Sequence, residues 1–227
     1  MKKKLETIHT RIQAAALSCS RDVKSIKLVA VSKTIPTAMI REAIDNGQTL
    51  FGENYIQEAK QKIAEISDSR VSWHFIGHLQ SNKAKYAVKL FDMIHTVDSI
   101  KLADELNRQA KKINKIQKIL LQVNTGMEIS KSGIPPGEAI DFAKKISNFS
   151  NLRIKGIMTI PPFYDAPEKA APYFKALRKI NERIKNETLP NVEMKELSMG
   201  MTGDFEVAIK EGATLIRIGT AIFGART

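Results

Sequence analysis

The chain has 227 residues, of which 43% are hydrophobic and 26% are charged, and its formal net charge at pH 7 is +12. This composition is that of a globular protein, and no apolar run is long enough to cross a bilayer, which excludes a membrane-spanning protein. The lysines are scattered over helical segments such as "KKINKIQK" without interleaved aromatic residues. The charge therefore predicts solvated helix faces and a general attraction for anions, not specific binding of nucleic acid.

The N-terminus and the cysteine content indicate the cellular compartment. The first ten residues, "MKKKLETIHT", are basic, but Glu6, His9 and Arg11 interrupt what would be the apolar core of a signal peptide. A single cysteine, Cys19, excludes an internal disulfide and fits a reducing environment. We therefore expect a cytoplasmic protein.

The chain opens with an amphipathic helix and continues with short apolar runs. The first apolar residues recur at the spacing of a helix with one buried face; they are Leu5, Ile8, Ile12, Ala15 and Ala16. Eight runs that resemble buried strands follow, at roughly 27–32, 48–52, 71–76, 91–95, 117–123, 153–158, 192–197 and 214–218. Segments with helical period lie between them, as in residues 102–113 and 173–184.

Helix starts follow the same alternation. Asp98 and Ser99 suit the beginning of one helix, and the prolines in residues 134–136 suit the first turn of another. Eight strands that alternate with helices predict an α/β protein with a (β/α)8 or TIM barrel, preceded by one extra helix. The alternative is a doubly wound open sheet, but neither a GxGxxG fingerprint nor a GK[ST] motif occurs. No repeat or linker interrupts the chain, so residues 1–227 are expected to form a single domain.

Two glycine-containing loops follow the last two predicted strands, where barrels of this class commonly bind phosphate groups. The first runs from Ser198 through Met199 and Gly200 to Asp204, and the second begins with Gly219 and Thr220. Glycine lets the backbone approach a ligand closely, and hydroxyl and N–H groups suit phosphate oxygens. A single glycine more often serves only a turn, but two such loops in these positions predict a phosphate site.

Two cations lie near the ends of the first and last predicted strands. Lys33 follows the apolar run in "LVAVSKTIP", and Arg217 alternates with Ile216 and Ile218, so its side chain should face the opposite way. Periodicity leaves open whether that side is the barrel interior or the helix layer, where Arg217 would pair with an acid. In a closed barrel the first strand is next to the eighth, which would gather Lys33, Arg217 and the phosphate loops at one rim. These are the parts of a site for pyridoxal 5′-phosphate (PLP), in which a lysine amine forms a Schiff base and a cation faces the pyridine nitrogen.

Long ordered motifs carry a resemblance that covers nearly the whole chain. They are "AVSKT", "FGENYIQE", "WHFIGHLQSNK", "TVDS", "GIMTIPP" and "LSMGMTGDFEVAIKEGATLIRIGTAIFG". In these motifs the sequence resembles the pyridoxal phosphate homeostasis proteins, which are built like the N-terminal barrel of alanine racemase. Thr202 departs from the family, where serine is more common, but it keeps the hydroxyl.

The resemblance implies a role for each cofactor-binding residue. It implies that Lys33 carries PLP and that Arg217 faces the pyridine nitrogen. It also implies that Ser198, Gly219 and Thr220 contact the phosphate. Asn54, in "GEN" after the second strand, is similar to the family's asparagine near the cofactor. Met199 and Gly200 belong to the same predicted set.

Polar residues elsewhere at the predicted rim suggest no metal site. His74 and His78 in "WHFIGH" are four residues apart, but on a strand and its following loop, which is a weak metal pair. His74 is expected to be a packed or hydrogen-bonded strand residue, whereas His78 could line a pocket. Residues 122–126, "QVNTG", end the fifth predicted strand with polar groups at the same rim.

A carrier of PLP is the predicted function, and no catalytic residue is assigned. An arginine at the pyridine nitrogen disfavours protonation of the ring, and racemisation needs a second acid or base across the substrate. In alanine racemases that group comes from an additional domain of the partner subunit; the sequence stops at Thr227, so we expect no such domain here. The resemblance implies maintenance of the vitamin B6 pool by a monomer, with PLP-dependent enzymes as transient recipients and amino acids as further ligands.

Two alternatives remain at this level. One is a PLP-dependent amino-acid racemase that uses a base from the barrel itself, for which Tyr55 and His78 are candidates. The other is a barrel enzyme that acts on a sugar phosphate without PLP.

Overall fold

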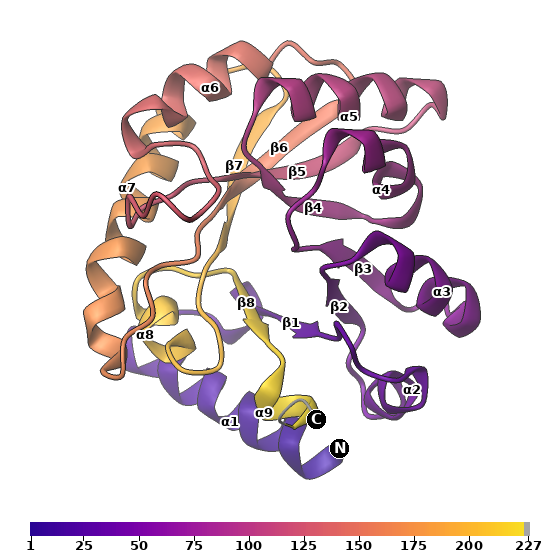
Figure 1. Ribbon diagram of the computed structural model, residues 1–227. Helices are drawn as coiled ribbons and strands as arrows, with labels where there is room; N and C mark the ends of the chain where they lie inside the picture. The colour runs from indigo at the N-terminus through magenta and orange to yellow at the C-terminus, as the bar shows by residue number, and fades with distance from the viewer. Residues whose placement is uncertain (225–227) are drawn as a thin grey trace.

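The computed structural model describes residues 1–224 and shows a closed barrel of eight parallel strands in sequence order (Figure 1). The strands are β1 (Lys27–Val31), β2 (Leu50–Glu53), β3 (Ser72–Phe75), β4 (Met93–Val97), β5 (Gln117–Gln122), β6 (Leu152–Met158), β7 (Val192–Ser198) and β8 (Leu215–Ile218). All eight agree with the predicted apolar runs, and β1 pairs with β8 as closure requires. The predicted barrel is confirmed; residues 225–227 of the predicted domain lie outside the described residues.

Helices follow the strands and surround the barrel (Figure 1). The α-helices are α1 (Lys2–Ser18), α2 (Thr37–Asp45), α3 (Ile56–Ile66), α4 (Ala84–Leu90), α5 (Ile100–Lys112), α6 (Ala139–Ile146), α7 (Ala171–Asn186), α8 (Phe205–Lys210) and α9 (Thr220–Phe223). Short 3₁₀ turns are η1 (Val23–Ser25), η2 (Ser81–Lys83), η3 (Pro136–Glu138) and η4 (Pro167–Ala170). Within residues 1–224, no helix has both the length and the apolar character that a membrane span requires.

The extra helix at the N-terminus is confirmed and packs on the outside of the barrel. Its five predicted apolar residues are all buried, and the helix packs against α8 and α9. α1 covers the part of the barrel where the chain closes, because β8 lies between α8 and α9 in sequence and pairs with β1. Burial of one apolar face in this way supplies most of a helix's stability in a folded protein.

The two predicted helix starts have different outcomes. Ser99 caps α5, because its hydroxyl accepts a hydrogen bond from the backbone N–H of Leu102 at 3.3 Å. The prolines of residues 134–136 instead lead into η3, and α6 begins only at Ala139. Proline at the start of a helical turn loses no hydrogen bond, so a short 3₁₀ turn satisfies the same preference as the predicted helix.

The barrel interior contains both apolar and polar side chains. A small apolar cluster fills part of it; its members are Val29, Leu50, Met93, Leu120, Met158 and Leu215. Ile216 and Ile218 instead belong to the large core between strands and helices. Arg217, between them in sequence, faces the opposite way, as the alternation predicted, and bonds inside the barrel to Ser198 of β7; periodicity had left the helix-facing side open. The barrel interior therefore holds a charged, hydrogen-bonded side chain at the position of Arg217.

Candidate functional site

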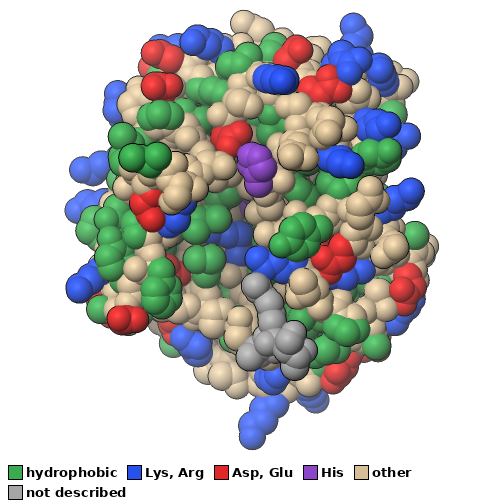
Figure 2. All heavy atoms as spheres, in the orientation of Figure 1, with side chains coloured by type: hydrophobic (Ala, Val, Ile, Leu, Met, Phe, Trp, Pro, Cys, Tyr) green, Lys and Arg blue, Asp and Glu red, His purple; other side chains and the backbone are tan. Residues whose placement is uncertain are grey.

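A cavity of about 430 Å³ opens at the carboxyl ends of the strands. It is lined by Val31, Lys33, Ile35, Asn54, Ile76, Lys131, Ile160, Pro161, Pro162, Phe163, Tyr164, Pro167, Ala170, Met201, Thr202, Gly203, Asp204, Arg217, Gly219, Thr220, Phe223 and Gly224. Figure 2 shows a hollow near the middle of this face, with basic side chains at its base and hydrophobic ones beside it. Its volume and mixed lining are those of a small-molecule site.

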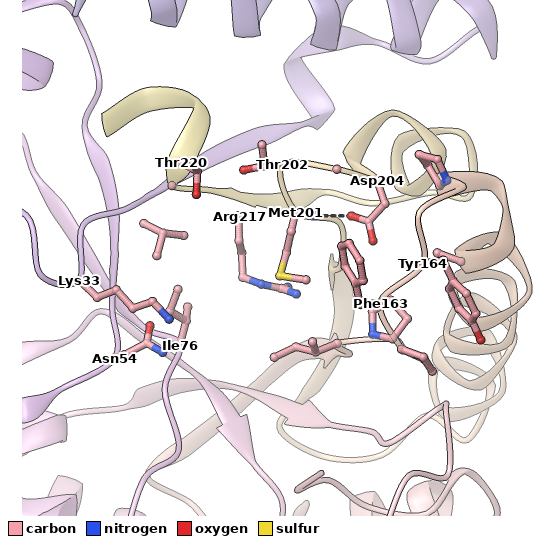
Figure 3. A pocket seen from close by; sticks show the side chains of 18 of the residues that line it. Lys33, Asn54, Ile76, Phe163, Tyr164, Met201, Thr202, Asp204, Arg217 and Thr220 are labelled. Carbon is pink, nitrogen blue, oxygen red and sulfur yellow. Dashed lines mark hydrogen bonds between the residues drawn. The ribbon is translucent and has the colours of Figure 1, made fainter. Parts of the chain in front are cut away.

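The cavity brings five of the eight predicted site residues together. Lys33, Asn54, Arg217, Gly219 and Thr220 all line it. In Figure 3 Lys33 and Asn54 lie on one side, Arg217 lies in the middle, and the loop that carries Asp204 lies on the other. The five come from the ends of β1, β2 and β8, so the closure of the barrel creates the cluster.

The backbone on either side of Lys33 is held by charged groups, of which Glu53 and Lys62 are buried and Glu58 is partly exposed. The Ser32 hydroxyl donates to Glu53 Oε1 at 2.6 Å, and Lys62 Nζ donates to the Ser32 carbonyl at 2.5 Å. On the other side, the Thr34 N–H donates to Glu58 Oε1 at 2.5 Å. Thr34 has a φ of 63°, a left-handed conformation that a β-branched residue adopts only under constraint. These bonds fix the turn from which the Lys33 side chain enters the cavity.

Lys62 joins the two carboxylates of this cluster. Its ammonium lies 2.9 Å from Glu53 Oε1 and 2.5 Å from Glu58 Oε1. The Glu53 side chain is fully buried, and burial raises its pKa, opposed by its bonds to Ser32 and Lys62. Glu53 Oε2 has no hydrogen-bond partner within the described part of the chain. The cluster therefore depends on Lys62 for compensation of the Glu53 charge.

Replacement of Lys62 by methionine is expected to lower the free energy of unfolding by about 3 kcal/mol or more, because Glu53 loses its partner cation. This loss of unfolding free energy should grow as the pH rises above about 4.3, the ordinary pKa of a glutamate side chain. A buried carboxyl with a raised pKa binds its proton more tightly than the unfolded chain does, so stability falls between the two pKa values. Urea unfolding of the ligand-free protein at several pH values measures both effects.

Lys155 is the matched control for this substitution. Its ammonium contacts the Glu193 carboxylate, which keeps 27% of its side chain exposed. Lys155→Met should therefore cost only about 1 kcal/mol or less. Equal losses in the two variants would contradict the special role assigned to Lys62.

Arg217 is a buried cation held by neutral groups. Only 4% of it is exposed; it donates from one guanidinium nitrogen to Ser198 Oγ at 2.5 Å and from the other to the Thr159 carbonyl at 2.9 Å. Burial lowers the pKa of Arg217 to about 10, and the nearby charge of Asp204 opposes the shift. Arg217 is therefore cationic at neutral pH and presents its charge to the cavity.

The two loops of the predicted phosphate site both border the cavity. In the loop after β7, the Met201 N–H donates to Asp204 Oδ1 at 2.6 Å, which fixes the turn (Figure 3). A Cβ built on Gly203 would meet nothing within 4 Å, so this part of the loop is open. After β8, a Cβ on Gly219 would lie 3.3 Å from both Cβ and the carbonyl oxygen of Val31. Glycine at 219 thus allows β8 and β1 to approach closely at the cavity.

The other three predicted residues lie next to the cavity without being part of its lining. Ser198 is fully buried and binds Arg217 inside the barrel. Met199 is fully buried in the core between strands and helices. Gly200 has a φ of 90°, and a Cβ there would lie 2.6 Å from the Cβ of Ala208. These residues position the loop and Arg217, and their direct contact with a ligand stays a prediction.

Asn54 places a buried hydrogen-bond acceptor at the cavity wall. Its Oδ1 is buried and has no hydrogen-bond partner among residues 1–224. The neighbouring loop approaches closely, since a Cβ on Gly77 would lie 2.2 Å from the Asn54 carbonyl oxygen. A buried polar atom without a partner is uncommon, and at a cavity wall it is suited to a ligand.

The remaining polar residues singled out in the sequence lie outside this lining. His74 is buried and hydrogen-bonded on β3, as expected, whereas His78 is exposed at the rim and outside the cavity wall. Gln122 and Asn124 bind backbone carbonyls of the loop after β5, and Thr125 contacts Thr159. No group of three or more potential metal ligands occurs in the part of the chain that the structure describes.

The sequence reasoning missed one wall of the cavity. Residues 160–164, "IPPFY", follow β6 and line the side opposite Lys33, and 86% of Phe163 is exposed (Figure 3). Lys131, in the loop after β5, donates to the Pro161 carbonyl at 3.0 Å and links the two loops. The aromatic residues beside two prolines were the available signal, because exposed aromatic residues in loops commonly contact ligands.

Known proteins are similar to this chain both in sequence and in the fold of the barrel. The profile of the family described as "Alanine racemase, N-terminal domain" matches residues 5–227. A relative from Aquifex aeolicus called "Pyridoxal phosphate homeostasis protein" is 41% identical over 99% of this chain and 97% of its own length. The structure of PipY from Synechococcus elongatus with PLP bound is 39% identical, with a TM-score of 0.83 over 94% of this chain and 100% of PipY.

Alanine racemase from Clostridium difficile matches with a TM-score of 0.77, over 99% of this chain and 57% of the racemase. At 11% identity this likeness shows the fold alone. The full-length identity to the Aquifex aeolicus relative and the matching profile show the family. The chain therefore belongs to the pyridoxal phosphate homeostasis protein family, whose barrel is that of the alanine racemase N-terminal domain.

Proposed function

We propose that residues 1–227 act as a single domain that carries PLP as a Schiff base on Lys33 and maintains the cellular pool of vitamin B6. The observation that carries this proposal is the convergence of Lys33, Arg217 and two glycine-containing loops on one cavity. PipY, a relative of 39% identity, is described with PLP bound, and the Aquifex aeolicus relative is named for PLP homeostasis. Both support the same ligand for this chain.

The residues at the cavity fit PLP group by group. Lys33 supplies the amine for the aldehyde, and Arg217 supplies a cation for the pyridine nitrogen. Thr220 and the backbone of Gly219 suit the phosphate, together with the open loop at residues 201–203. Asn54, with its unused buried acceptor, suits a polar group of the ring. We propose that Ser198, Met199 and Gly200, which lie next to the cavity lining, hold Arg217 and the loop after β7 in position.

A carrier function is favoured over catalysis by the charge at Arg217. Bound PLP supplies an aldehyde for the lysine and a conjugated ring that can accept electrons from a substrate. A cation at the pyridine nitrogen opposes protonation of the ring and so weakens that capacity. The two bases considered for a racemase, Tyr55 and His78, are absent from the cavity lining as described for residues 1–224. Neither is placed to exchange a proton with a ligand there.

Two measurements test this function against its alternatives. An absorption spectrum of the protein with added PLP should show the band of a lysine Schiff base, which a PLP-independent enzyme acting on sugar phosphates would lack. Incubation of the PLP-loaded protein with L-alanine and other amino acids, followed by chiral analysis, should show no D-isomer above that formed by free PLP. Catalytic formation of a D-amino acid would show that the protein is a racemase and would contradict the carrier function.

Recognition of phosphate should dominate retention of the ligand. Pyridoxal, which lacks the phosphate, is expected to bind roughly 100-fold more weakly than PLP, because each charge-assisted hydrogen bond contributes about 1.5–3 kcal/mol. Absorbance titrations with the two compounds measure the ratio. Thr220→Val should reduce the ratio, since it removes one hydroxyl from the proposed cradle. Equal affinities for PLP and pyridoxal would show that the two loops are ordinary turns.

The partners and location of the carrier stay predictions. We propose a cytoplasmic monomer that passes PLP transiently to PLP-dependent apoenzymes and that can also bind amino acids. Sedimentation equilibrium tests the monomer. Transfer is tested by activation of a PLP-dependent apoenzyme, compared at the same total PLP with and without the carrier.

A further inference from the structure

Four buried side chains form one hydrogen-bonded chain across the barrel interior. Arg217 of β8 donates to Ser198 Oγ of β7 at 2.5 Å, and Ser198 Oγ lies 3.0 Å from His95 Nδ1 of β4. His95 Nε2 lies 2.9 Å from Nδ1 of His74 on β3. No member is more than 6% exposed. His95 and His74 are outside the cavity lining described for residues 1–224, so the ligand site does not by itself explain this chain.

The chemistry of each group determines which member donates and which accepts along this hydrogen-bonded chain. A guanidinium only donates, so Ser198 Oγ accepts from Arg217 and has its own proton left to donate. His95 Nδ1 is the acceptor for that proton; if it donated instead, the buried Ser198 proton would lose this partner. His95 then carries its proton on Nε2 and donates to His74 Nδ1. His74 in turn carries its proton on Nε2.

The surroundings of the two histidines agree with neutral rings. Burial lowers the pKa of His74 to about 4; the charges of Lys27 and Lys118 act in the same direction, and that of Asp92 acts against it. Burial also lowers the pKa of His95, as do His74 and Arg217. Neutral rings can hold the directional chain, whereas two imidazolium rings would each donate from both nitrogens and could not bond to each other.

We propose that His95 and His74 are positioning residues that orient Ser198, and through it the guanidinium of Arg217, toward the ligand cavity. The Thr159 carbonyl is the second anchor of that guanidinium. Both anchors are neutral, and within residues 1–224 no carboxylate is hydrogen-bonded to Arg217; Asp204 acts on its charge only through space. The two anchors thus hold the cationic guanidinium in one orientation at the cavity. The inference rests on the proposed function only for the identity of the ligand.

The direction of the chain can be tested in the ligand-free protein. Nitrogen-15 NMR of labelled histidine should show His74 and His95 neutral and protonated on Nε2 between pH 6 and 8. This measurement does not involve PLP, so its outcome is independent of the proposed function. A signal from His95 protonated on Nδ1, or titration of His95 near its ordinary pKa, would overturn the proposed order of donors and acceptors.

The effect on Arg217 is tested with three variants. His95→Leu removes the acceptor for Ser198, whereas His95→Asn keeps an acceptor near the position of Nδ1. His78→Leu is the control, because it removes an exposed histidine outside the cavity wall. Against the wild type loaded with PLP, His95→Leu should bind PLP at least tenfold more weakly and shift its absorption band. His95→Asn should restore most of both properties, and His78→Leu should resemble the wild type.

Each result supports or overturns the proposal. Equal spectra and affinities for folded His95→Leu and the wild type would overturn it. If His95→Leu does not fold, His95→Asn and the histidine NMR decide: lost affinity despite a wild-type unfolding temperature in His95→Asn would contradict positioning through a simple acceptor. If the wild type itself fails to bind PLP, the proposed function fails, while the NMR measurement still tests the chain.

Discussion

Borohydride reduction of the PLP-loaded protein, followed by peptide mass mapping, is expected to place the pyridoxyl group on Lys33 alone. Lys33 follows β1 and lines the cavity, on a turn that Glu53, Glu58 and Lys62 hold in place. Reduction converts the reversible Schiff base into a stable secondary amine, so the label records which lysine held the ligand. Lys33→Ala should lose the visible absorption of the bound cofactor completely.

The control for this experiment is a lysine far from the cavity. Lys195 on β7 has 72% of its side chain exposed and is absent from the cavity lining described for residues 1–224. Lys195→Ala should keep the absorption and the labelled peptide of the wild type. Lys131 also lines the cavity, so a pyridoxyl group found on Lys131 in the native protein would overturn the assignment to Lys33.

The fold could be predicted from the sequence because barrel strands have a strong local signal. Strands buried on both faces form short continuous apolar runs, and each of the eight runs corresponds to one strand. The alternation of Ile216, Arg217 and Ile218 also predicted that Arg217 would face the opposite way from the two isoleucines, as it does, although periodicity alone did not decide which of them faces the helices. These features depend on residues close in sequence, which is why periodicity detects them.

The support of the site could not be predicted in the same way. The bonds that hold the Lys33 turn join β1, β2 and α3, and nothing in the spacing of Glu53 and Lys62 indicates that they meet. His95 lies in the apolar run of β4 and gave no separate signal, yet it contacts Ser198, which is 103 positions away. Such contacts are set by the closure of the barrel and by the tilt of its strands.

Ser198 shows that a loop motif does not by itself fix the position of a single side chain. In the sequence it stands beside the glycines of a predicted phosphate loop. In the structure it is the last residue of β7, and its hydroxyl accepts from Arg217 inside the barrel. The open part of the loop begins later, at Met201. The residues of this loop that line the cavity therefore begin after the strand end, and a direct contact of Ser198 with a ligand stays a prediction.

Arg217→Glu is expected to change the spectrum of bound PLP without preventing the Schiff base on Lys33. A cation facing the pyridine nitrogen opposes its protonation, whereas a carboxylate in the same place would stabilise the protonated ring. The protonated ring accepts electrons better, so the variant should also gain slow exchange of amino-acid α-protons. Absorption spectra across pH and deuterium incorporation from heavy water measure the two effects.

The structure makes folding of this variant the first control. A glutamate cannot donate to the Thr159 carbonyl or to Ser198 Oγ, so both anchors of Arg217 lose their partner. The new carboxylate would also face Asp204, whose pKa burial already raises. A lower unfolding temperature is therefore expected. Arg217→Lys keeps the charge but not the two-pronged geometry, and it is the matched variant for loss of these bonds.

The pair of variants separates the charge of residue 217 from its role in packing. If charge controls the ring, Arg217→Lys should keep the pH response of the wild-type spectrum although its stability falls, and only Arg217→Glu should shift that response and gain proton exchange. If packing alone matters, both variants should weaken PLP binding in parallel, with no change in the pH response of the ligand that remains. A folded Arg217→Glu protein whose spectrum and pH response match the wild type would show that the guanidinium points away from the ring. In that case the buried chain from His74 to Arg217 would be a structural element of the barrel, and the argument for a carrier from the charge at the pyridine nitrogen would be lost.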